Sequence, residues 1–125
     1  MKSRTCFDRA QKITEIGAAL AYAEYHAERI TSGPAPRVLH DVTSGIQTAA
    51  VKSRELGKSL KGPERKTMES IAGGLDRLKT RIEGGWSTLS ASEANGIRKE
   101  TQSLRKQVTD VWKGLRSSCS GGGRH

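Results

Sequence analysis

Lysines and arginines recur at seven-residue intervals late in the chain, and this spacing suits the binding of phosphates. One series, here called the lysine row, consists of Lys99, Lys106 and Lys113. A second series, here called the arginine stripe, consists of Arg98, Arg105 and Trp112. Because a helix returns to nearly the same face after seven residues, each series predicts a line of side chains along one helix. We interpret the two lines as a basic ridge that contacts phosphates, with Trp112 stacking on a base or supporting the ridge.

A second, shorter basic cluster is predicted from Arg54, Lys58 and Lys61. The chain of 125 residues has a formal net charge of +9, and residues 34–62 and 87–125 hold most of the excess. Nucleic acid is the partner that we expect, either RNA or DNA. A solvated surface, an acidic protein and an anionic membrane surface stay open as alternatives. No zinc finger, aromatic strand motif or basic zipper region is present, so backbone contacts are favoured over base reading.

A different chemistry, phosphoryl transfer, is suggested by the stretch Arg37–Gln47. In this stretch His40 is followed directly by Asp41, and several positions later by Ile46 and Gln47. The pattern resembles the phospho-accepting helix of some histidine kinases and phosphotransferases. That resemblance implies that His40 accepts a phosphoryl group and that Asp41 acts as its base. The alternative is an ordinary exposed histidine near the start of a helix.

Other reactive residues do not match the spacing of known sites. Glu24, His26 and Glu28 lack the Glu-x-x-His spacing of di-iron bundles. The segment 31–33 lacks the Lys-Ser/Thr frame of a phosphate-binding loop. No local motif indicates a Ser/His/Asp set. We therefore expect a binding protein that is not an enzyme and that holds no metal and no cofactor.

Apolar residues at alternating spacings of three and four predict four helices that would position these side chains. The predicted helices cover residues 5–30, 37–60, 64–83 and 90–116. Pro34 and Pro36 end the first helix, and Pro63 suits the first turn of the third. Ser90 and Glu93 have the spacing of a capping box. Trp86 is interpreted as an anchor of the connection before the fourth helix, with an exposed partner contact as the alternative.

Four amphipathic helices with short connections predict an all-α fold, a small antiparallel four-helix bundle. We expect one domain over residues 1–117 and a flexible Gly/Ser-rich tail over 118–125. An up-down-up-down order places both termini at one end, where Cys6 and Cys119 could pair. The alternative is a small apolar residue and an unpaired thiol. The core contains many small residues, so self-association is possible.

The surroundings of the protein can also be predicted. No apolar run is long enough for a membrane span, and no signal-like apolar region follows the basic N-terminus. We expect a cytoplasmic protein. In size, charge and helix content the chain resembles the small helical-bundle subunits of CRISPR effector complexes. This resemblance of architecture implies an accessory subunit that packs beside other protein subunits along a nucleic acid.

Overall fold

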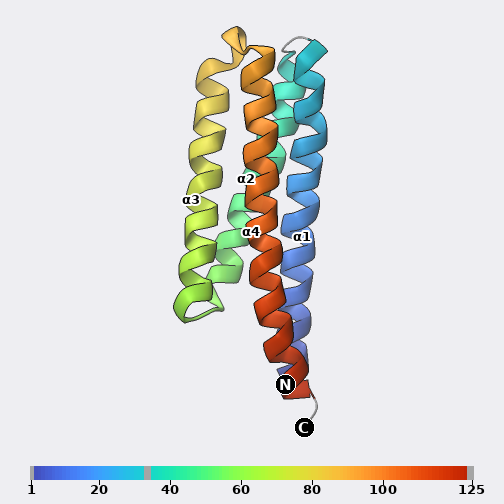
Figure 1. Cartoon of the computed structure of the whole chain (residues 1–125), viewed down its shortest axis with the longest axis vertical. Coiled ribbons are helices and arrows are strands. Elements are labelled where there is room, and N and C mark those ends of the chain that lie inside the picture. Colours follow the sequence, from blue (N-terminus) through green and yellow to red (C-terminus); the bar gives the residue numbers. More distant parts are fainter. Residues whose placement is uncertain (1, 33–34, 124–125) are drawn as a thin grey trace.

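The computed structural model describes the backbone of residues 2–32 and 35–123, which is helical apart from short connections. The helices are α1 (Lys2–Glu28), α2 (Pro36–Lys58), α3 (Gly62–Gly85) and α4 (Ala91–Gly123). Two short 3₁₀ helices, η1 (Arg29–Ser32) and η2 (Trp86–Thr88), follow α1 and α3. The four long helices lie side by side and alternate in direction, with both chain ends at the same end of the molecule (Figure 1). The predicted antiparallel four-helix bundle is confirmed.

The helices form a four-cornered arrangement in which α1 packs against both α2 and α4. Helix α3 packs extensively against α2 but makes fewer contacts with α4. In Figure 1, α4 continues beyond the lower end of α3 alongside the first turns of α1. The α1–α4 side of the bundle is therefore closely packed, whereas the α3–α4 side is more open.

The predicted apolar seams form the core. Ile16, Leu20 and Ile46 are among the fully buried side chains, as are Leu75 and Leu78. Burying a side chain of this size contributes about 1.5–3 kcal/mol relative to leaving it exposed. These seams therefore fix the rotation of each helix about its axis, and that rotation decides which charged residues face outward.

Polar positions within the seams are few. Thr101 is buried, and its hydroxyl donates to the carbonyl of Ile97 at 2.8 Å. Ser53, the predicted polar break in the second seam, is also buried, and its hydroxyl has no hydrogen-bond partner. The small side chains at such positions let the helices approach without leaving large polar groups in the core.

The connections follow the predicted chemistry. Pro36 and Pro63 occupy the first turns of α2 and α3. Gly62 has a φ of +64°, a conformation that L side chains rarely adopt. Ser90 accepts a hydrogen bond from the Glu93 N–H at 3.1 Å, and its own N–H donates to the Glu93 carboxylate at 3.0 Å. This reciprocal pair is the predicted capping box, and it lowers the pKa of Glu93 through the bonds from Ser90.

Helices α1, α3 and α4 extend further than predicted at one or both ends, and the difference is largest at the C-terminal end of α4. Helix α1 begins at Lys2, and α4 runs to Gly123, so it includes most of the segment predicted as a tail. Residues 117–120 contain no Gly or Pro, and nothing in the sequence stops the helix before the glycines at 121–123. The last two predicted tail residues lie outside the described part of the chain.

Helices α1 and α2 are in close contact at Gly45. A Cβ atom added at Gly45 would lie 2.9 Å from the backbone carbonyl oxygen of Ala19 and 3.1 Å from the Cβ of Ala23. A side chain there would push the two helices apart. Glycine at this position therefore permits the close packing of α1 against α2.

Two further predictions concern the ends of the bundle. Trp86 is buried in the core, which confirms it as an anchor of the α3–α4 connection. Cys6 is disulfide-bonded. The other cysteine of the chain, Cys119, has a side chain that lies outside the described residues. None of the described helices combines the length and apolarity needed to cross a membrane.

Candidate nucleic-acid interface

The lysine row lies on the outer face of α4. Lys99, Lys106 and Lys113 are all exposed, and none makes an ion pair with any residue that the structure describes. Seven residues of α-helix rise by about 10 Å, so the three ammonium groups repeat at roughly that interval along the axis. Their charges are therefore fully available to an external anion.

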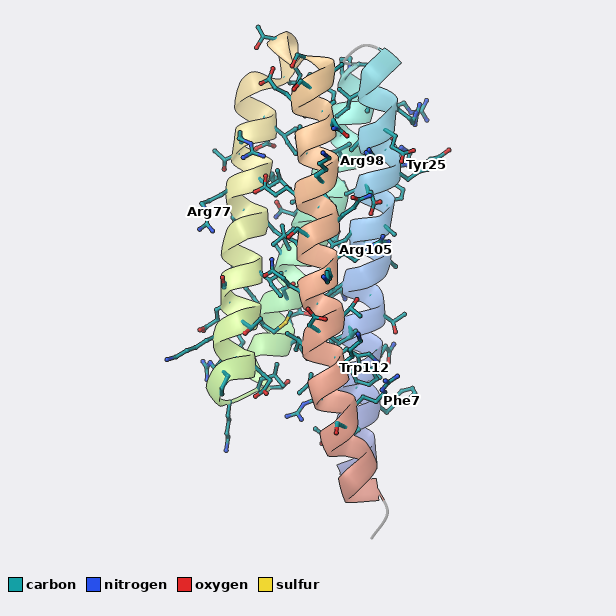
Figure 2. The ribbon with its side chains drawn as sticks, in the orientation of Figure 1. Phe7, Tyr25, Arg77, Arg98, Arg105 and Trp112 are labelled. Atoms are coloured by element: carbon teal, nitrogen blue, oxygen red, sulfur yellow. The ribbon has the colours of Figure 1, made fainter. Side chains whose placement is uncertain are left out.

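The arginine stripe lies on the side of α4 that faces α1, and its arginines are only partly exposed to solvent. Arg98 Nη1 lies 3.7 Å from Glu28 Oε1, and Arg98 Nη2 donates to Asn95 Oδ1 at 2.9 Å. Arg105 Nη2 lies 3.1 Å from Glu24 Oε2, in a charge contact that lacks hydrogen-bond geometry. Figure 2 shows Arg98, Arg105 and Trp112 along α4. These arginines thus connect α4 to α1, and their charge is partly neutralised within the fold.

Trp112 continues this inward-facing line. Its ring is half-buried and packs against the core cluster. Beside the stripe, Gln102 Nε2 donates to Glu24 Oε1 at 2.7 Å, which adds another α1–α4 bond. The indole therefore contributes to the packing of α4 against the core.

The second predicted basic cluster also contains both a paired arginine and lysines without an ion pair. Arg54 of α2 forms an ion pair and hydrogen bond with Asp76 of α3. Lys58 and Lys61 are exposed and form no ion pair within residues 2–32 and 35–123. Two of the three predicted cations at the α2–α3 connection therefore stay available.

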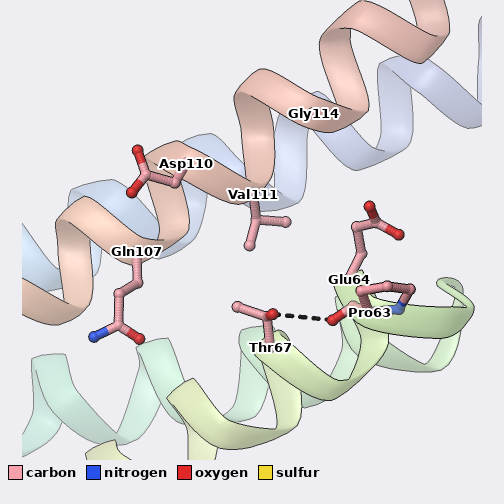
Figure 3. A pocket seen from close by; sticks show the side chains of 7 residues that line it. All are labelled: Pro63, Glu64, Thr67, Gln107, Asp110, Val111 and Gly114. Carbon is pink, nitrogen blue, oxygen red and sulfur yellow. Dashed lines mark hydrogen bonds between the residues drawn. The ribbon is translucent and has the colours of Figure 1, made fainter.

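An open groove of about 300 Å³ separates α4 from the start of α3 (Figure 3). Its polar lining includes Glu64, Thr67, Gln107 and Asp110, while Val111 supplies an apolar side chain. The hydroxyl of Thr67 donates to the carbonyl of Pro63 at 2.9 Å. The two carboxylates make this side of α4 unfavourable for phosphate. The basic surface of α4 therefore ends at this groove, on the side that faces α3.

His40 and Asp41 occupy the start of α2, as predicted. The His40 side chain is 83% exposed, and its Nδ1 lies 4.0 Å from Asp41 Oδ1. Asp41 also faces α1, where Tyr22 Oη donates to Asp41 Oδ1 at 3.3 Å. His26 Nδ1 lies 3.7 Å and Arg29 Nη1 4.0 Å from Asp41 Oδ2. The carboxylate is thus shared among several groups and is not dedicated to His40.

Sequence reasoning missed the α1 part of this arrangement. Before the proline-containing connection, Tyr22 precedes Tyr25 by three residues and His26 by four, and Arg29 follows these two residues by four and three. That spacing places them on neighbouring positions of one helix surface. The predicted turn brings this surface against the start of α2. The spacing in the sequence was therefore sufficient to predict that these side chains lie near α2. Their contact with Asp41 depends on the rotation of two helices.

No group of three or more His, Cys, Asp or Glu side chains in the described part of the chain is placed to hold a metal ion. Comparison with protein-family models, curated proteins and solved structures finds no significant match to this chain.

Proposed function

We propose that this protein binds the backbone of a nucleic acid through the lysine row and acts as a non-catalytic accessory subunit of a nucleoprotein complex. The observation that carries this proposal is the division of charge on α4. The adjacent arginines are paired with glutamates of α1, whereas the three lysines have no ion pair among the described residues.

A line of unpaired ammonium groups suits a linear polyanion. Each phosphate that a lysine neutralises releases condensed counterions, so several weak contacts add up to measurable affinity. A compact acidic ligand would not need groups repeated at about 10 Å along a helix. Periodicity therefore favours a nucleic-acid backbone over a small anion.

The surroundings of the lysine row indicate the path of the strand. Asp110 and Glu64 border the row on the α3 side and repel phosphate. The α1 side carries Arg98 and Arg105, which keep partial exposure despite their pairs. We infer that the backbone lies over α4 and toward α1, and that contacts there position the protein without reading sequence.

The experiment compares two double variants with the same loss of formal charge. Lys99→Ala/Lys106→Ala removes two members of the row, and Lys66→Ala/Arg77→Ala removes two exposed cations of α3. Neither Lys66 nor Arg77 makes an ion pair with the described residues, and Figure 2 shows Arg77 on α3, away from α4. Fluorescence anisotropy with labelled single-stranded RNA, single-stranded DNA and duplex DNA measures each affinity at low salt.

The row variant is expected to bind at least about tenfold more weakly than the α3 variant. Equal weakening by both variants would show that net charge alone drives binding, and it would reject the row as the site. Failure of the parent protein to bind any of the three probes at low salt would reject the proposed function. Docking to an acidic protein partner would then be the preferred hypothesis.

Phosphotransfer through His40 is a second candidate, favoured by one observation. The imidazole is 83% exposed and has a carboxylate within 4.0 Å. If this is the function, a phosphorylated response regulator should transfer an acid-labile phosphate to the protein but not to His40→Gln. His26→Gln is the matched control because His26 contacts the same carboxylate from a mostly buried position. Absence of label with several donors would reject this candidate.

A further inference from the structure

Two exposed tyrosine rings lie at the end of α1, near the start of α2. The exposed fraction is 64% for Tyr25 and 46% for Tyr22. In the described part of the chain only Phe7 and Val51 are comparably large, apolar and exposed. Aromatic surface of this kind costs free energy in water unless a ligand covers it. Most of the Tyr25 ring and about half of the Tyr22 ring are therefore accessible to a ligand.

The rings are held in position by buried polar groups. The His26 ring centroid lies 4.3 Å from that of Tyr22 and 5.1 Å from that of Tyr25, the latter edge to face. The Tyr22 hydroxyl donates to Asp41, and the side chains of His26 and Asp41 are only 12% and 19% exposed. Burial, followed by the charge of Asp41, raises the pKa of Tyr22. Both rings thus have a fixed inner edge and an outer surface that faces solvent.

Cations surround the rings. Arg29 Nη1 lies 3.0 Å from His26 Nδ1, and the Arg29 side chain is 49% exposed. Arg37 is exposed and has no ion pair with the described residues. The charges of both arginines reach Tyr22, since both act to lower its pKa against the dominant raising effects. Asp41 is the acidic group in contact with these side chains, so the arginines leave an excess of positive charge.

This group is continuous with the proposed backbone site. Arg98 contacts Glu28, which follows Tyr25 by three residues on α1, and Lys99 is the next residue of α4. Figure 2 shows Tyr25 and Arg98 at similar heights on neighbouring helices. The two surfaces lie on helices that pack against each other, α1 and α4. A strand that lies on the lysine row and bends toward α1 would meet the rings.

We propose that Tyr22 and Tyr25, with Arg29 and Arg37, form a stacking site for unpaired bases, so that the ligand is a single-stranded nucleic acid. Exposed aromatic faces beside guanidinium groups bind bases and phosphates together, and a duplex hides the base faces that such rings need. This inference rests on the proposed function and specifies that the nucleic acid is single-stranded. An uncharged protein partner is disfavoured because the rings are flanked by the half-exposed Arg29 and by Arg37, which has no ion pair with the described residues.

The test separates base stacking from charge. The probes are a labelled oligothymidylate and an abasic oligonucleotide of the same length, which has the same phosphates but no bases. The variants are Tyr25→Ala and the conservative Tyr25→Phe, which keeps the aromatic face. Because Tyr25 is largely exposed, neither change threatens the fold, and circular dichroism melting checks this directly.

The parent protein is expected to bind the oligothymidylate about tenfold more tightly than the abasic strand. Tyr25→Ala should lose that preference without a change in salt dependence, and Tyr25→Phe should retain it. Equal binding of both probes by the parent, or no effect of Tyr25→Ala on the oligothymidylate, would overturn the inference.

The outcomes also distinguish this inference from the proposed function. If Lys99→Ala/Lys106→Ala weakens both probes while Tyr25→Ala changes neither, the backbone site stands and the stacking site fails. If neither probe binds the parent at low salt, both fail. Self-association of the parent that Tyr25→Ala abolishes, without any preference for bases, would assign the rings to a contact between copies and overturn the stacking site.

Discussion

Two lines of side chains lie next to each other on α4, and they differ in what they contact. The arginine stripe faces α1, where Arg98 and Arg105 meet Glu28 and Glu24 and Trp112 packs against the core. The lysine row is displaced by a single residue, which is about 100° around the helix. Its members face solvent and make no ion pair with the described residues.

This difference shows that positive charge in the sequence has two separate roles. Charge in the arginine stripe joins two helices and is partly neutralised within the fold. Charge in the lysine row contributes little to the fold and is available to a ligand. The two lines should therefore respond oppositely to mutation, one through stability and the other through binding.

Reversing the charge of the whole lysine row should have the largest effect. Lys99→Glu/Lys106→Glu/Lys113→Glu is expected to weaken nucleic-acid binding by about 100-fold or more at low salt, because repulsion replaces three phosphate contacts. The melting temperature should change little, since these side chains contact nothing that the fold requires. Anisotropy and circular dichroism measure the two quantities. Loss of the folded state in this variant would show that the row is structural after all.

Removing the half-buried indole should act on the fold. Trp112→Ala is expected to lower the free energy of unfolding by about 2 kcal/mol, below the 3–5 kcal/mol typical of a fully buried tryptophan. Urea unfolding followed by circular dichroism measures this value. The neighbouring Lys113→Ala is the control, with an expected change within about 0.5 kcal/mol. Similar values for the two variants would contradict the distinction between the lines.

The contact of Glu24 with Arg105 should show a smaller effect. A double-mutant cycle with Glu24→Ala and Arg105→Ala is expected to give a coupling energy of about 0.5–1 kcal/mol, because Arg105 is 42% exposed and water screens the pair. The same cycle with Lys106→Ala in place of Arg105→Ala should give no coupling. Coupling of equal size in both cycles would indicate that the arginine is not specifically paired.

Acid should weaken paired charges while leaving the lysine row charged. The hydrogen bond and charge of Lys12 lower the pKa of Glu55 below 4.5, so this carboxylate stabilises the fold above that pH. The contribution is lost as the pH falls through the lowered pKa. The melting temperature of the parent should exceed that of Glu55→Gln at neutral pH by a margin that disappears well below pH 4.5. A margin that does not change with pH would contradict the pairing.

The architecture was predictable because apolar spacing determines it. The seams, the proline starts of α2 and α3, the Ser90–Glu93 capping box and the burial of Trp86 all follow from local sequence patterns. The ends of α1 and α4 did not, because no residue there stops a helix strongly. Helix ends depend on small differences in free energy that single residues do not reveal.

The division of charge was not predictable from the sequence. Arg98 and Lys99 are neighbours with the same charge, and which of them faces α1 depends on the rotation of α4 against a helix about 70 residues earlier in the chain. The same limit explains why Asp41 appeared to serve His40 alone. Its contacts with Tyr22, His26 and Arg29 come from the packing of α1 against α2.

The salt dependence of binding tests the central claim most directly. Affinity for a labelled single-stranded oligonucleotide is measured over a range of salt concentrations, for the parent and for Lys99→Ala/Lys106→Ala/Lys113→Ala. Each phosphate contact on a single strand contributes about 0.7 to the slope of log affinity against log salt. The account predicts that the slope of the variant is shallower by about 2. An unchanged slope would show that the lysine row does not contact the backbone.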